Sequence, residues 1–199
     1  MDNVLALVAS TFFANVNNGA LTTQVCIGDN TLVQKRPTPG QGAIVNIFQC
    51  VIVDLRDLSV QENFAWNSSR NVPPQFGKYV GKGEYLLIMT TCEALRESFV
   101  PEGELFALLQ KVGAMDKLQR LADALTHMDD RPMPPPGKDL LKRGYCYILV
   151  ATMGFGDDRG LEAVSLSSDI LLDFKLVWSD VLKRYVPAGY QSGFQTAVE

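Results

Sequence analysis

Residues 43–53 read AIVNIFQCVIV and are apolar at nearly every position, with Asn46 and Gln49 as the two exceptions. Because apolar side chains occupy both alternating faces, the pattern is typical of a strand that is covered on both sides. A strand of this kind lies in the middle of a sheet. We therefore expect this stretch to be the central strand of the core, with the rest of the chain arranged around it.

Other stretches also have strand character. Residues 84–91 (EYLLIMTT) and 145–153 (YCYILVATM) are apolar runs of the length of a strand. Residues 22–34 (TTQVCIGDNTLVQ) contain two β-rich runs around GDN at 28–30, which is typical of a hairpin because glycine and asparagine tolerate positive φ. Polar and aromatic residues alternate over residues 188–198, which predicts a terminal strand.

Three segments carry apolar residues at helical spacing. Residues 3–16 predict an amphipathic helix. Residues 102–128 predict two helices, or one kinked helix, with Gly113 at the break. A last helix is expected to start after a serine cap at 167 or 168 and to end near Lys183.

The mixture of these elements predicts the fold class. Residues 54–83 are polar and contain a Pro-Pro pair, and this length predicts an extended loop used for contact rather than a simple turn. Helices and strands do not follow a regular βαβαβ repeat, which favours α+β. We expect a single domain over residues 1–199, with a mixed or antiparallel sheet of about four to six strands flanked by helices.

Composition and charge exclude several classes of partner. The chain of 199 residues has a formal net charge of -4 and no run of Lys or Arg longer than a pair, so specific nucleic-acid binding is not expected. The amino-terminal apolar stretch lacks a basic n-region, and no segment approaches the roughly 20 apolar residues of a membrane span. Four widely spaced cysteines without a C-x-x-C pair indicate core residues and a cytoplasmic origin. No membrane contact is expected.

The glycine-rich stretch GFGDDRG at 154–160 has the spacing G-x-G-x-x-x-G. The dinucleotide fingerprint is G-x-G-x-x-G opening a helix, and here Asp157 and Asp158 would repel a pyrophosphate. These two carboxylates, with Glu162, could instead bind a divalent cation, but adjacent carboxylates in glycine loops are ordinarily turn formers. The stretch is therefore interpreted as a solvated connection from a strand to a helix.

Sequence motifs of an enzyme are missing. The chain has no P-loop, no G-x-S-x-G and no H-E-x-x-H, and its single histidine, His127, excludes a two-histidine metal site within one chain. We therefore expect no enzyme activity, no catalytic or metal-binding residues and no cofactor.

Aromatic residues in polar segments are the candidate interface residues. Phe64 and Trp66 lie in the segment predicted to be an extended loop, and Tyr185, Tyr190 and Phe194 lie near the carboxyl end. Aromatic residues in such places are common anchors of protein interfaces. The alternative is that they fold back onto the core.

Several stretches, taken in order, resemble the cap or tail-terminator proteins of contractile phage tails and phage-tail-like injection systems. The resemblance rests on MDNVLALVASTF, RPTPGQGAIVNIFQCVIVD, EYLLIMTT, LQRLADALTHMDDRPM and, after the predicted helix with Trp178, KRYVPAGYQSGFQ. Together they cover roughly half of the chain. The chain departs from the family in DLRDLSVQENFAWN, where the family has an asparagine-rich stretch, and in Leu121-Ala122, where it has a leucine-glycine pair.

The resemblance implies a structural subunit without a catalytic site. Such a subunit forms a ring, usually a hexamer, on the last layer of a tail tube, contacts the sheath and stops polymerisation. Its partners would be further copies of itself, tube and sheath proteins, and neck or connector proteins, in a virion or injection particle assembled in the bacterial cytoplasm. The alternatives are another neck, connector or minor capsid component, and a small metal- or ligand-binding α+β enzyme built around Asp157 and Asp158.

Overall fold

Two antiparallel sheets and two short helices form the described part of the protein. The structure is a computed structural model that describes residues 4–12, 23–35, 48–66, 68–94, 103–126, 145–155, 160–165 and 169–191. Sheet A has the strand order β10-β9-β1-β2-β3 and sheet B the order β5-β4-β6-β7-β8. None of the helices in these segments is long and apolar enough to cross a membrane.

The strands of each sheet come from distant parts of the chain. Sheet A consists of β1 (Val4–Phe12), β2 (Thr23–Ile27), β3 (Asn30–Lys35), β9 (Asp169–Ser179) and β10 (Arg184–Gln191). Sheet B consists of β4 (Phe48–Asp54), β5 (Val60–Trp66), β6 (Lys82–Ala94), β7 (Tyr145–Met153) and β8 (Leu161–Ser165). The helical elements are a 3₁₀ turn η1 (Pro74–Lys78), α1 (Glu104–Lys111) and α2 (Asp116–Thr126).

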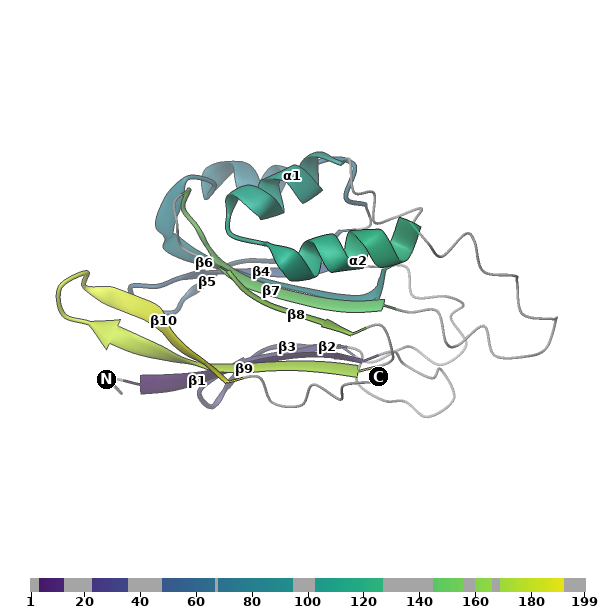
Figure 1. Cartoon of the computed structure of the whole chain (residues 1–199). Coiled ribbons are helices and arrows are strands. Elements are labelled where there is room, and N and C mark those ends of the chain that lie inside the picture. The colour runs from purple at the N-terminus through teal and green to yellow at the C-terminus, as the bar shows by residue number, and fades with distance from the viewer. Residues whose placement is uncertain are drawn as a thin grey trace.

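The elements lie in three layers, with sheet B in the middle (Figure 1). The helices α1 and α2 cover one face of sheet B, and sheet A covers the other. Strand β4 shows why both faces need a cover: Phe48, Cys50 and Ile52 belong to the core beneath the helices, whereas Val51 and Val53 belong to the core between the sheets. The prediction of a central strand is confirmed for residues 48–54, and the residues before 48 lie outside the described part.

The predicted fold class is wrong, because the protein is mostly β. Two segments that we expected to be helices form strands: residues 4–12 are β1, and residues 169–179 are β9. These two strands pair with each other, from Val4 opposite Val177 to Phe12 opposite Asp169. Their apolar residues occupy both faces, so the same sequences satisfy helical spacing and strand alternation, and pairing within sheet A decides between them.

Two further expectations are corrected in sheet B. The segment 54–83 is not one extended loop, since it contains β5 and η1. Gly160 leads into strand β8 rather than into a helix. The hairpin at 22–34, the strands at 84–91 and 145–153 and the two helices within 102–128 are confirmed, and Gly113 ends α1 with a φ of 107° that favours glycine. The terminal strand runs over Arg184–Gln191, and the later residues lie outside the described part.

Candidate interaction surface at the hairpin end

The β9–β10 hairpin projects beyond the rest of the molecule at one end (Figure 1). Its turn carries two aliphatic side chains, Val181 with 91% and Leu182 with 54% of its surface exposed. Lys183 closes the turn with a φ of 52°, and the amide of Leu182 donates a hydrogen bond to Oγ of Ser179 at 3.2 Å. The turn geometry therefore holds apolar side chains in water instead of folding them back.

The base of this hairpin is fixed to the core. Trp178 and Tyr185 meet edge to face with their ring centroids 5.3 Å apart, and Tyr185 is only 4% exposed. The amide of Tyr185 donates a hydrogen bond to the carbonyl of Leu55 at 2.8 Å, and the Trp178 indole donates one to Asp180 at 3.1 Å. Because the base is anchored, the tip is presented in a defined position.

Two further exposed apolar residues lie at the same end. Val4 is 50% exposed and pairs with Val177, just before the turn. Phe155 is 57% exposed, and a Cβ built on Gly81 would lie 3.5 Å from its ring. Gly83 lies two residues after Gly81, and a Cβ on it would lie 3.5 Å from Nη1 of Arg184, the first residue of β10.

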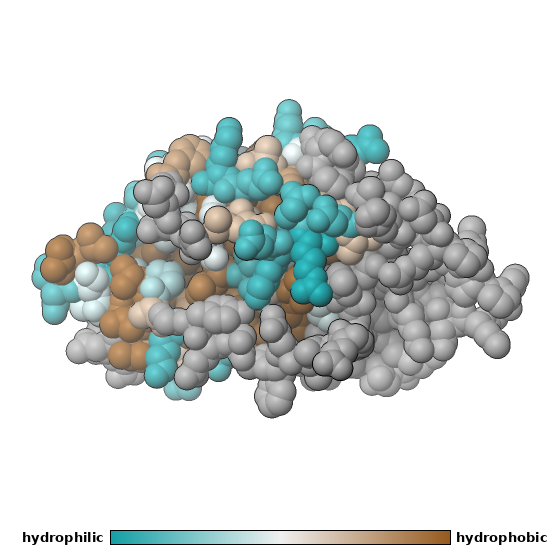
Figure 2. Space-filling view, in the orientation of Figure 1, coloured by the Kyte–Doolittle hydropathy of each residue, from teal (hydrophilic) through white to brown (hydrophobic). Residues whose placement is uncertain are grey.

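We call Val4, Phe155, Val181 and Leu182 the hairpin-end surface. Figure 2 shows hydrophobic atoms gathered where the hairpin projects. Exposed apolar residues that occur singly need no explanation, but a group of them on a projecting element is typical of a contact site. The geometry supports binding rather than catalysis at this end.

Two ion pairs lie near the hairpin. Lys183 lies 4.0 Å from Asp180, and Arg56 forms an ion pair with Asp54, whose side chain is buried. Arg56 donates hydrogen bonds to both carboxylate oxygens of Asp54 and, through its backbone amide, to Oδ1. These hydrogen bonds lower the pKa of Asp54 below its ordinary value of 3.8 and outweigh the opposing effect of burial.

Acid should therefore weaken the turn between β4 and β5. Because the folded pKa of Asp54 is depressed, its contribution to stability is complete above the unfolded pKa and is lost as the pH falls through the folded value. We expect Asp54→Asn to make the free energy of unfolding less dependent on pH in acid. The substitution should lower the free energy of unfolding at neutral pH by only about 1 kcal/mol, because the partner Arg56 is exposed and solvent screens the ion pair. Urea unfolding between neutral pH and about pH 3 measures this effect. An unchanged acid slope in Asp54→Asn would contradict the assignment.

The structure places the aromatic residues that we predicted for an interface in different environments. Phe64 packs against Phe76 with ring centroids 5.7 Å apart, and Trp66 is half-buried against the core beneath the helices. Tyr185 is buried at the base of the hairpin. Tyr190 of β10 pairs with Phe174 of β9, and Phe194 lies outside the described residues. Only Tyr185 is thereby placed at the hairpin end, and the interface role of all five stays a prediction.

The candidate cation site falls mostly outside the described part, because Asp157 and Asp158 lie there, as does His127. Glu162 is described and is 7% exposed. Its carboxylate accepts hydrogen bonds from the amides of Met115 and Leu118, at 2.8 and 3.0 Å, and from the Tyr147 hydroxyl at 2.6 Å. Glu162 therefore caps the start of α2, and among the described residues no group of three or more His, Cys, Asp or Glu side chains is arranged to hold a metal ion.

The glycines of the predicted connection make close packing contacts. A Cβ on Gly154 would lie 3.0 Å from the Cα of Gly83, and one on Gly160 would lie 2.9 Å from a methyl group of Leu149. The amide of Gly160 also donates a hydrogen bond to the carbonyl of Gly113 at 2.9 Å. At these two positions glycine allows segments to approach each other, which is a structural role.

Sequence reasoning missed Val181 and Leu182. The helix predicted to end near Lys183 includes both residues and has Val181 on its buried stripe, and this prediction is wrong because both lie in the exposed turn after β9. The available signal was the alternation of Ile170, Leu172, Phe174 and Leu176, which are all buried and which predict a strand ending just before a turn.

No family model matches the chain, and no curated protein matches it significantly.

Proposed function

We propose that this protein is a structural assembly subunit that joins neighbouring copies through its hairpin-end surface. The observation that carries the proposal is the exposure of Val181 and Leu182 on a hairpin whose base is anchored. Exposed aliphatic side chains on a rigid element are favourable only when a partner covers them. This surface and the anchored geometry behind it support the proposed structural role.

Burial of the tip side chains against a neighbouring subunit would contribute favourable free energy at each contact of an assembly. Full burial of one Val or Leu side chain contributes about 1.5–3 kcal/mol, and the fixed base reduces the entropy lost on binding. A contact of this kind is directional, because the hairpin of one subunit meets a different surface of the next. Head-to-tail contacts between identical subunits generate rings when the rotation closes.

In its specific form, the proposal is that the ring caps a tail tube and sheath, as in the tail terminators that the sequence resembles. Capping would then end polymerisation and fix the length of the particle. A neck, connector or minor capsid subunit would use the same kind of surface and is the second form of the proposal. Binding of the purified protein to the ends of purified tail tubes, viewed by electron microscopy, separates the first form from the second.

Removing the apolar tip should abolish assembly without unfolding the protein. We expect Val181→Gln/Leu182→Gln to leave the melting temperature within a few degrees of wild type, since both side chains are largely exposed. Light scattering coupled to size exclusion should show that its higher oligomers are lost. The matched control is Met115→Gln, which removes another exposed apolar side chain, 43% exposed, at the start of α2 in the helical layer.

Three outcomes of this experiment would contradict the proposal. The first is a wild-type protein that stays monomeric, and the second is equal loss of oligomers in the tip variant and the control. The third is a wild-type protein that does not self-associate but sediments with lipid vesicles, while the tip variant does not sediment with them. That result would assign the tip to a bilayer surface.

A further inference from the structure

Arg184 is the first residue of β10 and follows the exposed hairpin tip by two positions. Its guanidinium lies across the backbone of Gly83, where an added Cβ would lie 3.5 Å from Nη1 and 3.7 Å from Nη2. The next residue, Tyr185, is buried, and its amide donates a hydrogen bond to the carbonyl of Leu55 at 2.8 Å. The anchored base that presents the tip therefore also fixes the backbone that carries Arg184.

This guanidinium lacks the partner that a buried N–H group ordinarily has. The Nε atom of Arg184 is buried and has no hydrogen-bond partner within the described part of the protein. None of the ion pairs between described residues includes Arg184. A buried donor without an acceptor destabilises a folded chain, and in a native structure such a group calls for an explanation. The explanation that fits Arg184 is a group supplied from outside the subunit.

The described carboxylates near the hairpin do not supply this group. Asp54 and Asp180 each form an ion pair with another basic residue close to them in the chain. Glu84 directly follows Gly83, yet no ion pair among the described residues joins it to Arg184. Within the described segments, Arg184 is therefore a half-buried cation without a carboxylate of its own subunit.

We propose that Arg184 binds a carboxylate of the neighbouring subunit in the assembly. This inference rests on the proposed function, because it adds a charged anchor beside the apolar tip of the hairpin. A guanidinium presents its N–H donors in a planar fork that matches the two oxygens of a carboxylate. Arginine is also one of the residues that most often contribute strongly to binding at protein interfaces.

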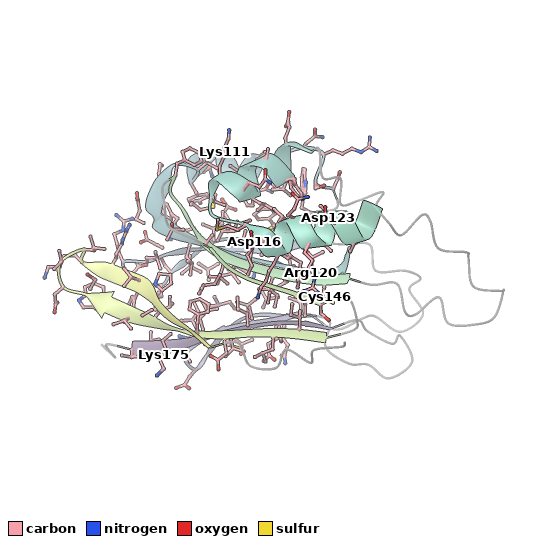
Figure 3. All side chains as sticks on the ribbon, viewed as in Figure 1. Lys111, Asp116, Arg120, Asp123, Cys146 and Lys175 are labelled. Carbon is pink, nitrogen blue, oxygen red and sulfur yellow. The ribbon has the colours of Figure 1, made fainter. Side chains whose placement is uncertain are left out.

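A second copy of this chain has carboxylates to offer. The chain contains 22 Asp and Glu residues against 18 Lys and Arg residues, so acidic groups are in excess. Figure 3 shows two exposed carboxylates, Asp116 and Asp123, on α2 in the helical layer rather than on the projecting hairpin. A contact between Arg184 of one copy and an acidic group on a different surface of the next is head-to-tail, which is the kind of contact that closes into a ring.

Arg184→Gln should weaken assembly and leave the fold intact. We expect its dissociation constant to rise at least about tenfold, because the neighbour's carboxylate loses its charged donor. The melting temperature should stay within a few degrees of wild type, because the guanidinium is in no ion pair among the described residues. Sedimentation velocity measures the dissociation constant. The matched control is Lys183→Gln, which removes the adjacent, 75% exposed cation and should change the constant by less than about threefold.

Arg184→Lys allows the neighbour's carboxylate to be identified. A carbodiimide joins a lysine amine to a carboxylate in contact with it but does not join a guanidinium. The introduced lysine keeps the charge and loses the fork, so assembly should weaken less than in Arg184→Gln. Mass spectrometry of assemblies mixed from isotope-labelled and unlabelled chains should show a link from position 184 to an Asp or Glu of another chain. A link confined to Glu84 of the same chain would assign Arg184 to an internal ion pair and overturn the inference.

The remaining outcomes separate this inference from the proposed function. Oligomers that are lost in the tip variant but form in Arg184→Gln as in wild type would overturn the Arg184 contact alone. Equal losses in Arg184→Gln and Lys183→Gln would also overturn it, because they would show a general effect of charge. A wild-type protein that stays monomeric would overturn the proposed function, and this inference with it. Weaker assembly in Arg184→Gln, together with a link between chains in Arg184→Lys, would support the contact.

Discussion

Replacing Gly103 with alanine is expected to destabilise the protein by about 3 kcal/mol or more, because the added methyl group has no space. A Cβ at this position would lie 2.0 Å from the carbonyl oxygen of Ser69 and 2.6 Å from its carbonyl carbon. Both atoms belong to backbone, so no side-chain rotation relieves the overlap. The chain at 69–70 must move away from the start of α1.

That movement would also remove hydrogen bonds at the start of α1. The amides of Glu104 and Leu105 donate to the carbonyls of Arg70 and Ser69, at 2.9 and 3.2 Å. Gly103, the residue before the helix, makes no side-chain cap, so these two carbonyls take the place of one. Loss of such a cap costs about 1 kcal/mol in addition to the steric strain.

Gly77→Ala is the matched control for Gly103→Ala. A Cβ on Gly77 would meet no atom within 4 Å, so the variant is expected to be within about 0.5 kcal/mol of wild type or slightly more stable. Urea unfolding followed by circular dichroism compares the two. A loss below about 1 kcal/mol in Gly103→Ala would show that the loop at 69–70 yields easily, contrary to the packing described here.

The sequence predicted sheet B better than sheet A for a physical reason. Strands β4, β6 and β7 are covered on both faces, so their segments are continuous apolar runs too short for a buried helix. Helices α1 and α2 each cover sheet B with one apolar stripe, which gives a clear helical period. In these segments local pattern and tertiary environment agree.

The predictions for β1 and β9 of sheet A are wrong because both faces of these strands carry apolar residues. In β9 the buried Ile170, Leu172, Phe174 and Leu176 alternate with outer residues that include Leu171 and Val177. Because apolar residues lie on both faces of the strand, some of them also fall three or four positions apart, which is the spacing of an amphipathic helix.

The exposure of the hairpin tip was harder to predict from the sequence than the position of the strand before it. An apolar residue in a chain is ordinarily expected in the core, and only the turn geometry shows that Val181 and Leu182 are held in water. The aromatic residues chosen from the sequence illustrate the converse, since Phe64 and Tyr185 belong to polar stretches of sequence but pack against the hydrophobic core. Exposure depends on where the chain turns, which local pattern did not specify here.

Replacing Glu162 with alanine is expected to destabilise the protein by about 3–4 kcal/mol. The substitution leaves three hydrogen-bond donors without their acceptor, namely the amides of Met115 and Leu118 and the hydroxyl of Tyr147. A buried donor that loses its partner costs about 1–3 kcal/mol, less where water can enter. Because Glu162 belongs to β8 and two of the donors lie at the start of α2, the helix should also loosen from the sheet.

Conservative variants separate the contributions of this cluster. Glu162→Gln keeps one acceptor oxygen and is expected to cost about 1–2 kcal/mol, and Tyr147→Phe removes a single hydrogen bond and about 1 kcal/mol. Asp116→Asn changes an exposed charge at the same helix end and should cost less than about 0.5 kcal/mol. Urea unfolding gives these values, and hydrogen exchange at the Met115 and Leu118 amides reports on the helix end itself.

The alkaline limb of the stability curve gives an independent test of the cluster. Burial, and then the nearby Glu162 carboxylate, raise the pKa of Tyr147 well above its ordinary value of 10.0. Because the folded pKa is raised, the protein should lose stability as the pH rises above the unfolded pKa of the tyrosine. Tyr147→Phe should remove that part of the loss. If Tyr147→Phe keeps the full alkaline loss, or Glu162→Ala unfolds like wild type, the carboxylate does not hold α2 to the sheet.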